Sequence, residues 1–248
     1  MTHTSMFDLP MFDLPTFPEV NPCTTIPHKI YQTWDTKELP ADMAAAVQSV
    51  KDANPGFEHF LYDDNDCRHF IEAHFPPEIL AAFNTLIPGA FKADLWRYCI
   101  LYIQGGIYLD IKFVPVNGFQ FKTLIESEQL CKDRPEYFKN MNGVYNACMI
   151  LAPGNIYMKQ AILTIYKHVK EKNYGVNGLY ITGPGLLSEI IPCDYTYSLF
   201  HKIVDSIHLN DTLILQAYPT YRTWTQNYYT KSKKEHYGAA WLNKRVFT

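Results

Sequence analysis

Apolar and polar positions follow a strand pattern and a helix pattern in turn along this chain. Residues 26–34 (IPHKIYQTW) and 57–63 (FEHFLYD) have the apolar and aromatic composition of β-strands. Residues 41–54 between them have an alanine-rich helical spacing, and the Asn-Pro-Gly sequence at 54–56 ends that helix. This order predicts a β-α-β unit, which implies parallel strands in one sheet.

The same alternation continues through most of the chain. Helices are expected over residues 65–75, 76–86, 89–106 and 156–173, and strands over residues 107–110, 111–116, 145–153 and 206–216. No internal repeat of domain size is present. The pattern predicts an α/β fold.

Two regions of the chain differ in character. Residues 6–15 contain the sequence MFDLP twice, and the proline-rich stretch that follows has no strand pattern. Residues 1–25 are therefore expected to form an irregular arm. Residues 26–248 are enough to bury a substantial core as one domain.

The helix expected at 89–106 has two distinct faces. Its apolar positions recur at helical spacing and form one stripe, made by Phe91, Leu95, Tyr98 and Tyr102. Asp94 and Arg97 are three residues apart and share a different face. Gly105 and Gly106 follow, and they allow the helix and the next strand to approach closely.

Charge and cysteine usage exclude several classes of protein. The formal net charge is -3, so general binding to nucleic acid or to an acidic membrane is not expected. The six cysteines form no CxxC pair, which argues against a zinc site and a disulfide scaffold. The sequence has no signal-peptide pattern and no apolar run of the roughly 20 residues that cross a bilayer. A cytoplasmic location is the expectation.

Three charged residues are candidates for binding. Asp110 ends an expected strand, where open α/β sheets bind their ligands, although an aspartate that caps the following turn is the ordinary alternative. Asp94 and Arg97 have an equally ordinary interpretation as an ion pair on an exposed helix. Their bulky neighbours Trp96 and Tyr98 indicate partial burial. A buried acid and guanidinium on one face could bind a polyol and a phosphate.

Six segments, in this order, resemble a known family: IPHKIYQTW, NPGFEHFLYDD, FKADLWRYCILYIQGGIYLD, YNACMILAPG, TGPG and HYGAAW. They span residues 26–241, and the family is glycosyltransferase family 32, the sugar-transfer proteins with a DXD sugar-binding region. The resemblance implies a GT-A fold, with a Rossmann-like, mostly parallel sheet flanked by helices. It also implies a nucleotide-sugar donor and transfer with retention of anomeric configuration.

The resemblance assigns roles to the residues that match the family's motifs. Asp94 would bind sugar hydroxyls, and Arg97 would bind the donor. Asp110 matches the first acid of the DXD motif, which contacts the ribose or sugar and often a metal ion through water. Asn146 matches a polar position near the reacting sugar.

Further matching positions lie around the expected donor. The resemblance places Gln32 or Trp34 against the nucleotide, and it places His236 and Trp241 in a C-terminal lid that touches the diphosphate or its metal. Gly183 lies in the TGPG segment, which could cradle a phosphate at the start of the next helix. An ordinary helix-entry turn is the alternative for this segment.

Lys112 departs from the family pattern, which has an aspartate that coordinates manganese at this position. Departure of the leaving group builds negative charge on the nucleoside diphosphate, and a cation must neutralise that charge. Three interpretations are open. Lys112 turns out of the site, while Asp110 and His236 hold the metal; or Lys112, helped by Arg97 or the KSKK sequence at 231–234, replaces the metal. In the third interpretation the site is inactive and only binds glycans.

The sequence therefore predicts a glycosyltransferase that moves a hexose from a GDP- or UDP-sugar to a glycan acceptor, with mannose as the first candidate. Manganese is expected to be weakly bound or dispensable. A catalytically inactive glycan- or nucleotide-sugar-binding protein on the same fold is the alternative. The sequence identifies no nucleophile, so attack from the side of the leaving group is expected. A short chain of this kind suits a bacterial or viral source, and its oligomeric state is not indicated.

Overall fold

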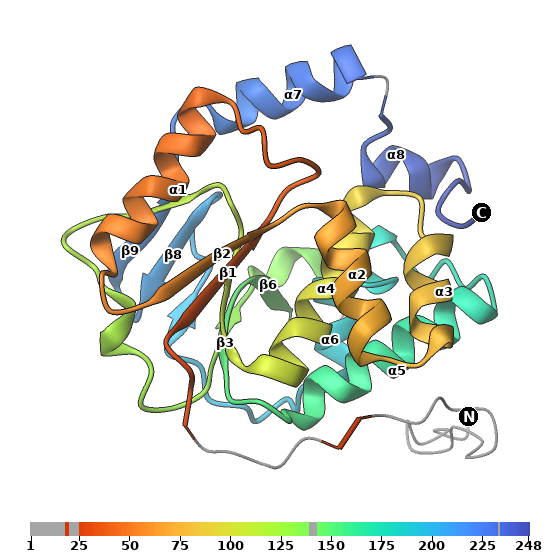
Figure 1. Ribbon diagram of the computed structural model, residues 1–248, viewed down its shortest axis with the longest axis horizontal. Coiled ribbons are helices and arrows are strands. Elements are labelled where there is room, and N and C mark those ends of the chain that lie inside the picture. The colour runs from red at the N-terminus through yellow and green to blue at the C-terminus, as the bar shows by residue number, and fades with distance from the viewer. Residues whose placement is uncertain (1–17, 20–24, 139–142, 233) are drawn as a thin grey trace.

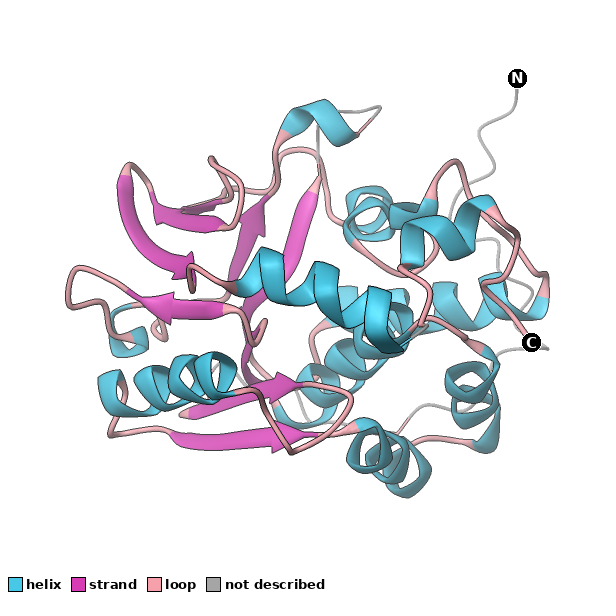
Figure 2. Cartoon of the chain, turned by 90° about the horizontal axis from the view of Figure 1, so that it is seen from above, coloured by secondary structure: helices cyan, strands magenta, loops and turns pink. Residues whose placement is uncertain are grey.

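The computed structural model describes residues 18–19, 25–138, 143–232 and 234–248. The MFDLP repeat at 6–15 lies outside the described residues, as does most of the arm expected over 1–25. Figures 1 and 2 show a sheet with helices packed beside it. The described strands are β1 (Lys29–Thr33), β2 (Glu58–Tyr62), β3 (Gly106–Leu109), β4 (Phe113–Pro115), β5 (Gln129–Lys132), β6 (Val144–Leu151), β7 (Leu199–Phe200), β8 (Ser206–Leu209) and β9 (Thr212–Ala217).

The helices alternate with the strands along the first part of the chain, as the sequence predicts. The α-helices are α1 (Ala41–Ala53), α2 (Asp64–His74), α3 (Pro77–Thr85), α4 (Gly89–Gln104), α5 (Ile156–Lys170), α6 (Pro184–Ile190), α7 (Tyr221–Ser232) and α8 (Tyr237–Leu242). Short 3₁₀ helices are η1 (Phe121–Thr123), η2 (Pro135–Tyr137) and η3 (Gly178–Tyr180). Figure 1 shows α2 to α6 gathered on one side of β1 and β3, with α1 on the other side.

The strand order of the sheet is β2-β1-β3-β6-β5-β7-β8-β9-β4. The predicted β-α-β unit is confirmed, because β1 pairs with β2 in parallel from Lys29 opposite Glu58 to Thr33 opposite Tyr62. Strand β1 also pairs in parallel with β3, and β5 with β7. The remaining pairings are antiparallel. The described sheet is therefore mixed, and the expectation of a mostly parallel sheet is wrong.

A short connection explains the antiparallel pairing of β8 with β9. Strands β8 and β9 are joined by Asn210 and Asp211, and Asn210 adopts a positive φ of 51°. Two-residue loops with positive φ connect antiparallel hairpin strands, whereas parallel neighbours need a long crossover. The α/β class is confirmed, and its parallel part is centred on β2, β1 and β3.

Helix α4 lies in the core beside β3. The predicted apolar stripe is confirmed, because all four of its side chains are at most 5% exposed: Phe91, Leu95, Tyr98 and Tyr102. The face that carries Asp94 and Arg97 is also buried, with exposures of 8% and 6%. This helix is therefore buried on more than one face, and its polar pair must find partners inside the protein.

Gly105 and Gly106 allow α4 to lead directly into β3. Both have positive φ, 60° and 101°. A Cβ atom at Gly105 would lie 2.6 Å from Pro153, and one at Gly106 would lie 2.8 Å from the carbonyl oxygen of Lys29. The expected close approach of helix and strand is confirmed, and it fixes the distance between the α4 side chains and the end of β3.

Several strands reach the same edge of the sheet where β3 ends. The amide of Asp110, just after β3, donates to the carbonyl of Ala147 near the start of β6, at 2.8 Å. The amide of Tyr218, just after β9, donates to the carbonyl of Lys112 at 3.0 Å. We call the region around Asp110, Lys112, Ala147 and Tyr218 the site edge. It receives polar side chains from segments far apart in the sequence.

Candidate functional site

Arg97 is the centre of the polar cluster at the site edge. Its Nη1 lies 3.3 Å from Asp110 Oδ1, and its Nη2 lies 3.2 Å from Asp94 Oδ1. Nη1 also donates to the main-chain carbonyl of Asn146 at 2.8 Å, and the guanidinium lies 4.2 Å from the centre of the Tyr108 ring. Burial opposes the charge of Arg97, but Tyr108 and the two carboxylates raise its pKa above the usual value. The guanidinium stays charged and is held in one place.

Asp94 accepts hydrogen bonds at both carboxylate oxygens. Asn146 Nδ2 donates to Oδ1 at 2.8 Å, and the Thr182 hydroxyl donates to Oδ2 at 2.7 Å. Burial raises the pKa of Asp94, while Arg97 and these two donors act against the rise. A buried carboxylate with this many partners is fixed in orientation, as a group that binds hydroxyls must be.

Gly183 lies beside Asp94 at the start of α6. A Cβ atom at Gly183 would come within 3.2 Å of Asp94 Oδ2. A phosphate placed here would meet the carboxylate of Asp94, which would repel it. The local charge therefore disfavours the expected phosphate cradle, and the close neighbours of Gly183 leave little room for a side chain at this position.

Asp110 connects the cluster to the sheet. Its Oδ1 accepts from the Tyr108 hydroxyl at 2.8 Å in addition to its contact with Arg97. Its side chain is 26% exposed, more than those of Asp94 and Arg97. Of the three charged groups, Asp110 is therefore the most open to an incoming ligand.

Lys112 points into the site edge. Its Nζ lies 3.8 Å from Asp110 Oδ2 and 3.3 Å from Asp205 Oδ1, and its side chain is only 12% exposed. Burial alone would lower its pKa, but Tyr145, Asp110, Tyr221 and Asp205 hold it well above the usual value. The interpretation in which Lys112 turns out of the site is therefore wrong.

Gln32 lies beneath the site edge instead of facing a ligand. It is fully buried, its Nε2 lies 3.5 Å from the carbonyl oxygen of Asp110, and its Oε1 lies 2.7 Å from His59 Nε2. Burial, helped by Lys51, lowers the pKa of His59 to about 4, so the neutral ring donates to Gln32. Gln32 supports the main chain at Asp110, and direct contact with a nucleotide would need it to leave the core.

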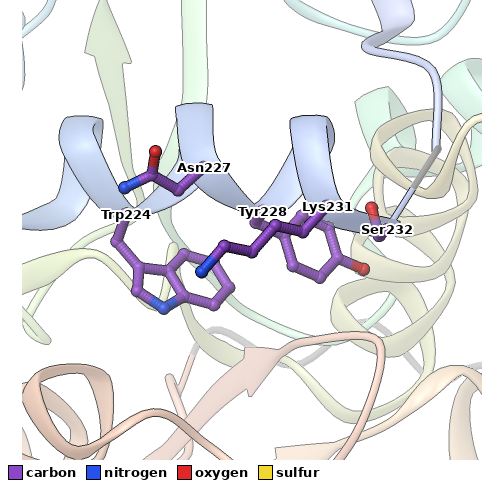
Figure 3. A pocket seen from close by; sticks show the side chains of 5 residues that line it. All are labelled: Trp224, Asn227, Tyr228, Lys231 and Ser232. Atoms are coloured by element: carbon purple, nitrogen blue, oxygen red, sulfur yellow. The ribbon is translucent and has the colours of Figure 1, made fainter.

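Trp34 faces helix α7 at the end of β1. Its ring centre lies 5.4 Å from that of Trp224 and 5.7 Å from that of Tyr228. Helix α7 lines a cavity of about 400 Å³ with Trp224, Asn227, Tyr228, Lys231 and Ser232. Figure 3 shows the side chains of these five residues on α7. The half-buried Trp34 is thus next to an aromatic surface made by α7.

His236 and Trp241 lie in the C-terminal segment around α8. His236 Nδ1 accepts from the amide of Gly238 at 3.2 Å, and Trp241 Nε1 donates to the carbonyl of Tyr174 at 2.7 Å. These contacts begin and anchor the short helix α8. The ring centre of Tyr237 lies 5.8 Å from that of Phe91 on α4, so α8 packs beside the helix that carries Asp94 and Arg97. Burial, and then the negative charge of Asp94, raise the pKa of Tyr237. The structure does not bring His236 or Trp241 into direct contact with that cluster.

The side chains at the site edge do not fit a divalent metal ion. Arg97 and Tyr108 occupy Asp110 Oδ1, and the ammonium of Lys112 faces Oδ2. A protonated lysine cannot ligate a metal. Among the described residues, no group of three or more His, Cys, Asp or Glu is placed to hold an ion. The expected pairing of Asp110 with His236 as metal ligands has no support from the geometry.

Three contributors to the cluster were not predicted from the sequence: Thr182, Tyr145 and Asp205. Thr182 begins the TGPG segment, which was expected to cradle a phosphate. The segment does reach the cluster, but through the Thr182 hydroxyl that donates to Asp94. Asp205 has a positive φ of 59°, and its side chain reaches Lys112 from the segment before β8. The sequence around Asp205 contains no motif that could have identified it.

Known proteins share sequence and fold with this chain. The family model described as "Glycosyltransferase sugar-binding region containing DXD motif" matches residues 40–131. Here the motif reads Asp110-Ile111-Lys112. The solved structure of the PaToxG glycosyltransferase matches with a TM-score of 0.53 and 16% identity, over 67% of this chain and 69% of that one. The predicted glycosyltransferase-type fold is confirmed.

Curated relatives include fungal and viral proteins. Inositol phosphoceramide mannosyltransferase 3 of Schizosaccharomyces pombe is 29% identical over 75% of this chain and 49% of its own length. Inositol phosphoceramide mannosyltransferase 2 of the same yeast is 35% identical over 42% and 30%. The uncharacterised glycosyltransferase L373 of Acanthamoeba polyphaga mimivirus is 35% identical over 36% of each chain. The chain thus spans about half or less of these relatives.

Within the described part of the chain, no helix is both long and apolar enough to cross a membrane. The cytoplasmic location stays a prediction.

The matched region contains Asp94, Arg97, Asp110 and Lys112, which are the charged residues that the site edge brings together. Residues 40–131 of this chain are thus similar to the proteins that carry a glycosyltransferase sugar-binding region with a DXD motif.

Proposed function

We propose that this chain is a retaining glycosyltransferase that moves a hexose from a nucleotide-diphosphate sugar to an acceptor hydroxyl. The observation that carries the proposal is the meeting of Asp94, Arg97, Asp110 and Asn146 at one sheet edge. An acid that binds hydroxyls lies next to a guanidinium that binds anions, which suits a ligand with a sugar at one end and a diphosphate at the other. Residues 26–248 would form the catalytic domain.

Mannose is the proposed sugar, with GDP-mannose as the first donor to test. The support is that both yeast relatives are named as mannosyltransferases. The acceptor is proposed to be a glycan or another sugar-like polyol. The same two relatives are named for inositol phosphoceramide, so an inositol phosphate headgroup belongs among the acceptors tested. The mimivirus relative supports a viral source.

Each residue of the cluster has a proposed part in the reaction. Asp94, oriented by Asn146 and Thr182, would accept hydrogen bonds from sugar hydroxyls that strengthen as the sugar becomes oxocarbenium-like. Arg97 would orient the donor from the buried side. Asp110 would contact the ribose or sugar, because it is the more exposed acid.

Manganese is proposed to be weakly bound or dispensable. Support comes from the ammonium of Lys112, which faces the oxygen of Asp110 that a metal would need. A divalent ion at this position would also be repelled by Lys112 and Arg97.

A donor screen tests the proposed function. Thermal unfolding is measured with GDP-mannose, GDP, and a panel of UDP-sugars, with and without manganese; a ligand at 100 times its dissociation constant should stabilise the fold by about 2.7 kcal/mol. The stabilising donor is then incubated with glycan and inositol phosphate acceptors, and the product's anomeric configuration is read by NMR. Binding without turnover of any donor would favour a binding protein, and a product of inverted configuration would contradict retention.

A further inference from the structure

Lys112 is held between two carboxylates that come from different parts of the chain. Its ammonium lies 3.3 Å from Asp205 Oδ1 and 3.8 Å from Asp110 Oδ2. The centres of three aromatic rings lie 5.2 to 5.6 Å away, from Phe113, Tyr145 and Tyr221. A strongly hydrated cation has thus been placed in a pocket where water is largely excluded.

The surrounding structure fixes this cation in position. The carbonyl of Lys112 accepts from the amide of Tyr218, and the carbonyl of Asp205 accepts from the amide of Ala217, so both residues are tied to the end of β9. The other carboxylate oxygen of Asp205 accepts from Arg222 Nε on α7. Asp205 is therefore oriented on one side by Arg222 and orients Lys112 on the other.

The charge at this position has been reversed. An aspartate at position 112 would complete the DXD motif and carry one negative charge, whereas Lys112 carries one positive charge. The difference is two charges, which equals the charge of one divalent cation. Without any metal, the site edge therefore has the electrostatic balance that a metal-loaded DXD site would have.

We propose that Lys112 is the cation that binds the donor's diphosphate and stabilises its departure, and that Asp205 is its positioning residue. This inference rests on the proposed function and makes transfer independent of a divalent metal. The bond from the anomeric carbon to the β-phosphate oxygen breaks, and its electron pair stays on the phosphate beside Lys112. The acceptor oxygen forms the new bond to the anomeric carbon, and its proton passes to the departing phosphate.

The competing account is that Lys112 only closes the sheet edge by pairing Asp110 with Asp205. In that case the two carboxylates would neutralise the ammonium, and it would contribute nothing to the affinity for a diphosphate. The two accounts predict different affinities for a nucleoside diphosphate. Affinity for GDP and UDP, measured by titration calorimetry, is the quantity that separates them.

The experiment compares manganese with EDTA for the wild type and three variants. We expect the wild-type dissociation constant for GDP or UDP to change by less than about threefold between the two conditions. Lys112→Met should bind about 10- to 100-fold more weakly, because one charge-assisted contact is lost. Lys112→Asp should bind weakly in EDTA and regain affinity with manganese, because it restores a metal-binding acid. The matched control Lys122→Met, at an exposed position of η1, should behave as the wild type.

Two results would overturn the inference alone. One is wild-type binding that needs manganese, a measurement that requires no variant to fold. The other is a folded Lys112→Met variant that binds in EDTA as tightly as the wild type. If neither nucleotide binds under any condition, the proposed function itself fails and the inference fails with it.

Discussion

Asn146 Nδ2 lies 2.8 Å from Asp94 Oδ1, although Asn146 is on β6 and Asp94 on α4. The same amide also donates to the Tyr98 hydroxyl at 2.8 Å. Both contacts are buried, so the sheet and the helix are joined by hydrogen bonds where the candidate sugar site lies. The orientation of Asp94 therefore depends on a residue outside its own helix.

Replacement of Asn146 tests this dependence. Asn146→Ala should lower donor turnover about 10- to 100-fold, because Asp94 loses a donor that orients it and holds its charge. Asn146→Asp should be worse, because a second carboxylate would repel Asp94. Donor turnover and thermal unfolding are measured for both variants. Equal turnover in wild type and Asn146→Ala would show that Asp94 needs no support from β6.

Asp205 is expected to act on rate rather than on affinity. Asp205→Asn keeps the shape of the side chain but removes the charge that holds Lys112 and Arg222. Turnover should fall about tenfold because the ammonium of Lys112 is held less firmly in position toward the diphosphate. The dissociation constant for GDP or UDP should stay equal or decrease, because one negative charge near the diphosphate is gone. Weaker nucleotide binding with unchanged turnover would contradict this assignment.

His59 should make stability depend on pH. Its pKa is lowered from 6.5 in the unfolded chain to about 4 in the fold. Its contribution to stability is complete above pH 6.5 and is lost as pH falls toward 4, because only the unfolded state takes up a proton in this range. Between pH 7 and pH 5 the wild type should lose about 2 kcal/mol more unfolding free energy than His59→Gln. Urea unfolding at the two pH values gives the comparison, and parallel losses would refute it.

Trp34 is expected to report on nucleotide binding. A base stacked on an aromatic side chain contributes about 1 to 3 kcal/mol, so Trp34→Ala should weaken GDP or UDP binding about 5- to 150-fold. Trp224→Ala serves as the matched comparison, because its ring packs on Trp34 from α7. It should affect nucleotide binding less than Trp34→Ala. The opposite order would place the base against α7 instead.

The sequence allowed the local elements and the charged cluster to be predicted. Helical spacing separated the apolar stripe of α4 from Asp94 and Arg97, and the glycines after α4 placed Asp110 beside them. These relationships are short in sequence and follow from the geometry of one helix and one strand. For that reason the convergence of the three charged groups was predictable.

Contacts between distant segments were not predictable. The order and direction in which strands β5, β6, β7, β8 and β9 pair depend on tertiary packing. This explains why the mixed sheet was not predicted. Asp205 reaches Lys112 from the segment before β8, and no pattern in the sequence connects the two residues. The resemblance placed Gln32 or Trp34 at the nucleotide, but both faces of β1 are covered, and this burial of Gln32 follows from packing that the strand pattern does not indicate.

The central claim is that Asp94 and its partners bind an activated sugar for transfer. It is tested most directly by release of nucleoside diphosphate from the donor that binds, measured for the wild type and Asp94→Asn at equal folded concentration. Asp94→Asn keeps the size of the side chain and removes the charged acceptor. We predict turnover by the wild type and a loss of about 100-fold or more in the variant. Equal rates in the two proteins, with both folded, would contradict the claim.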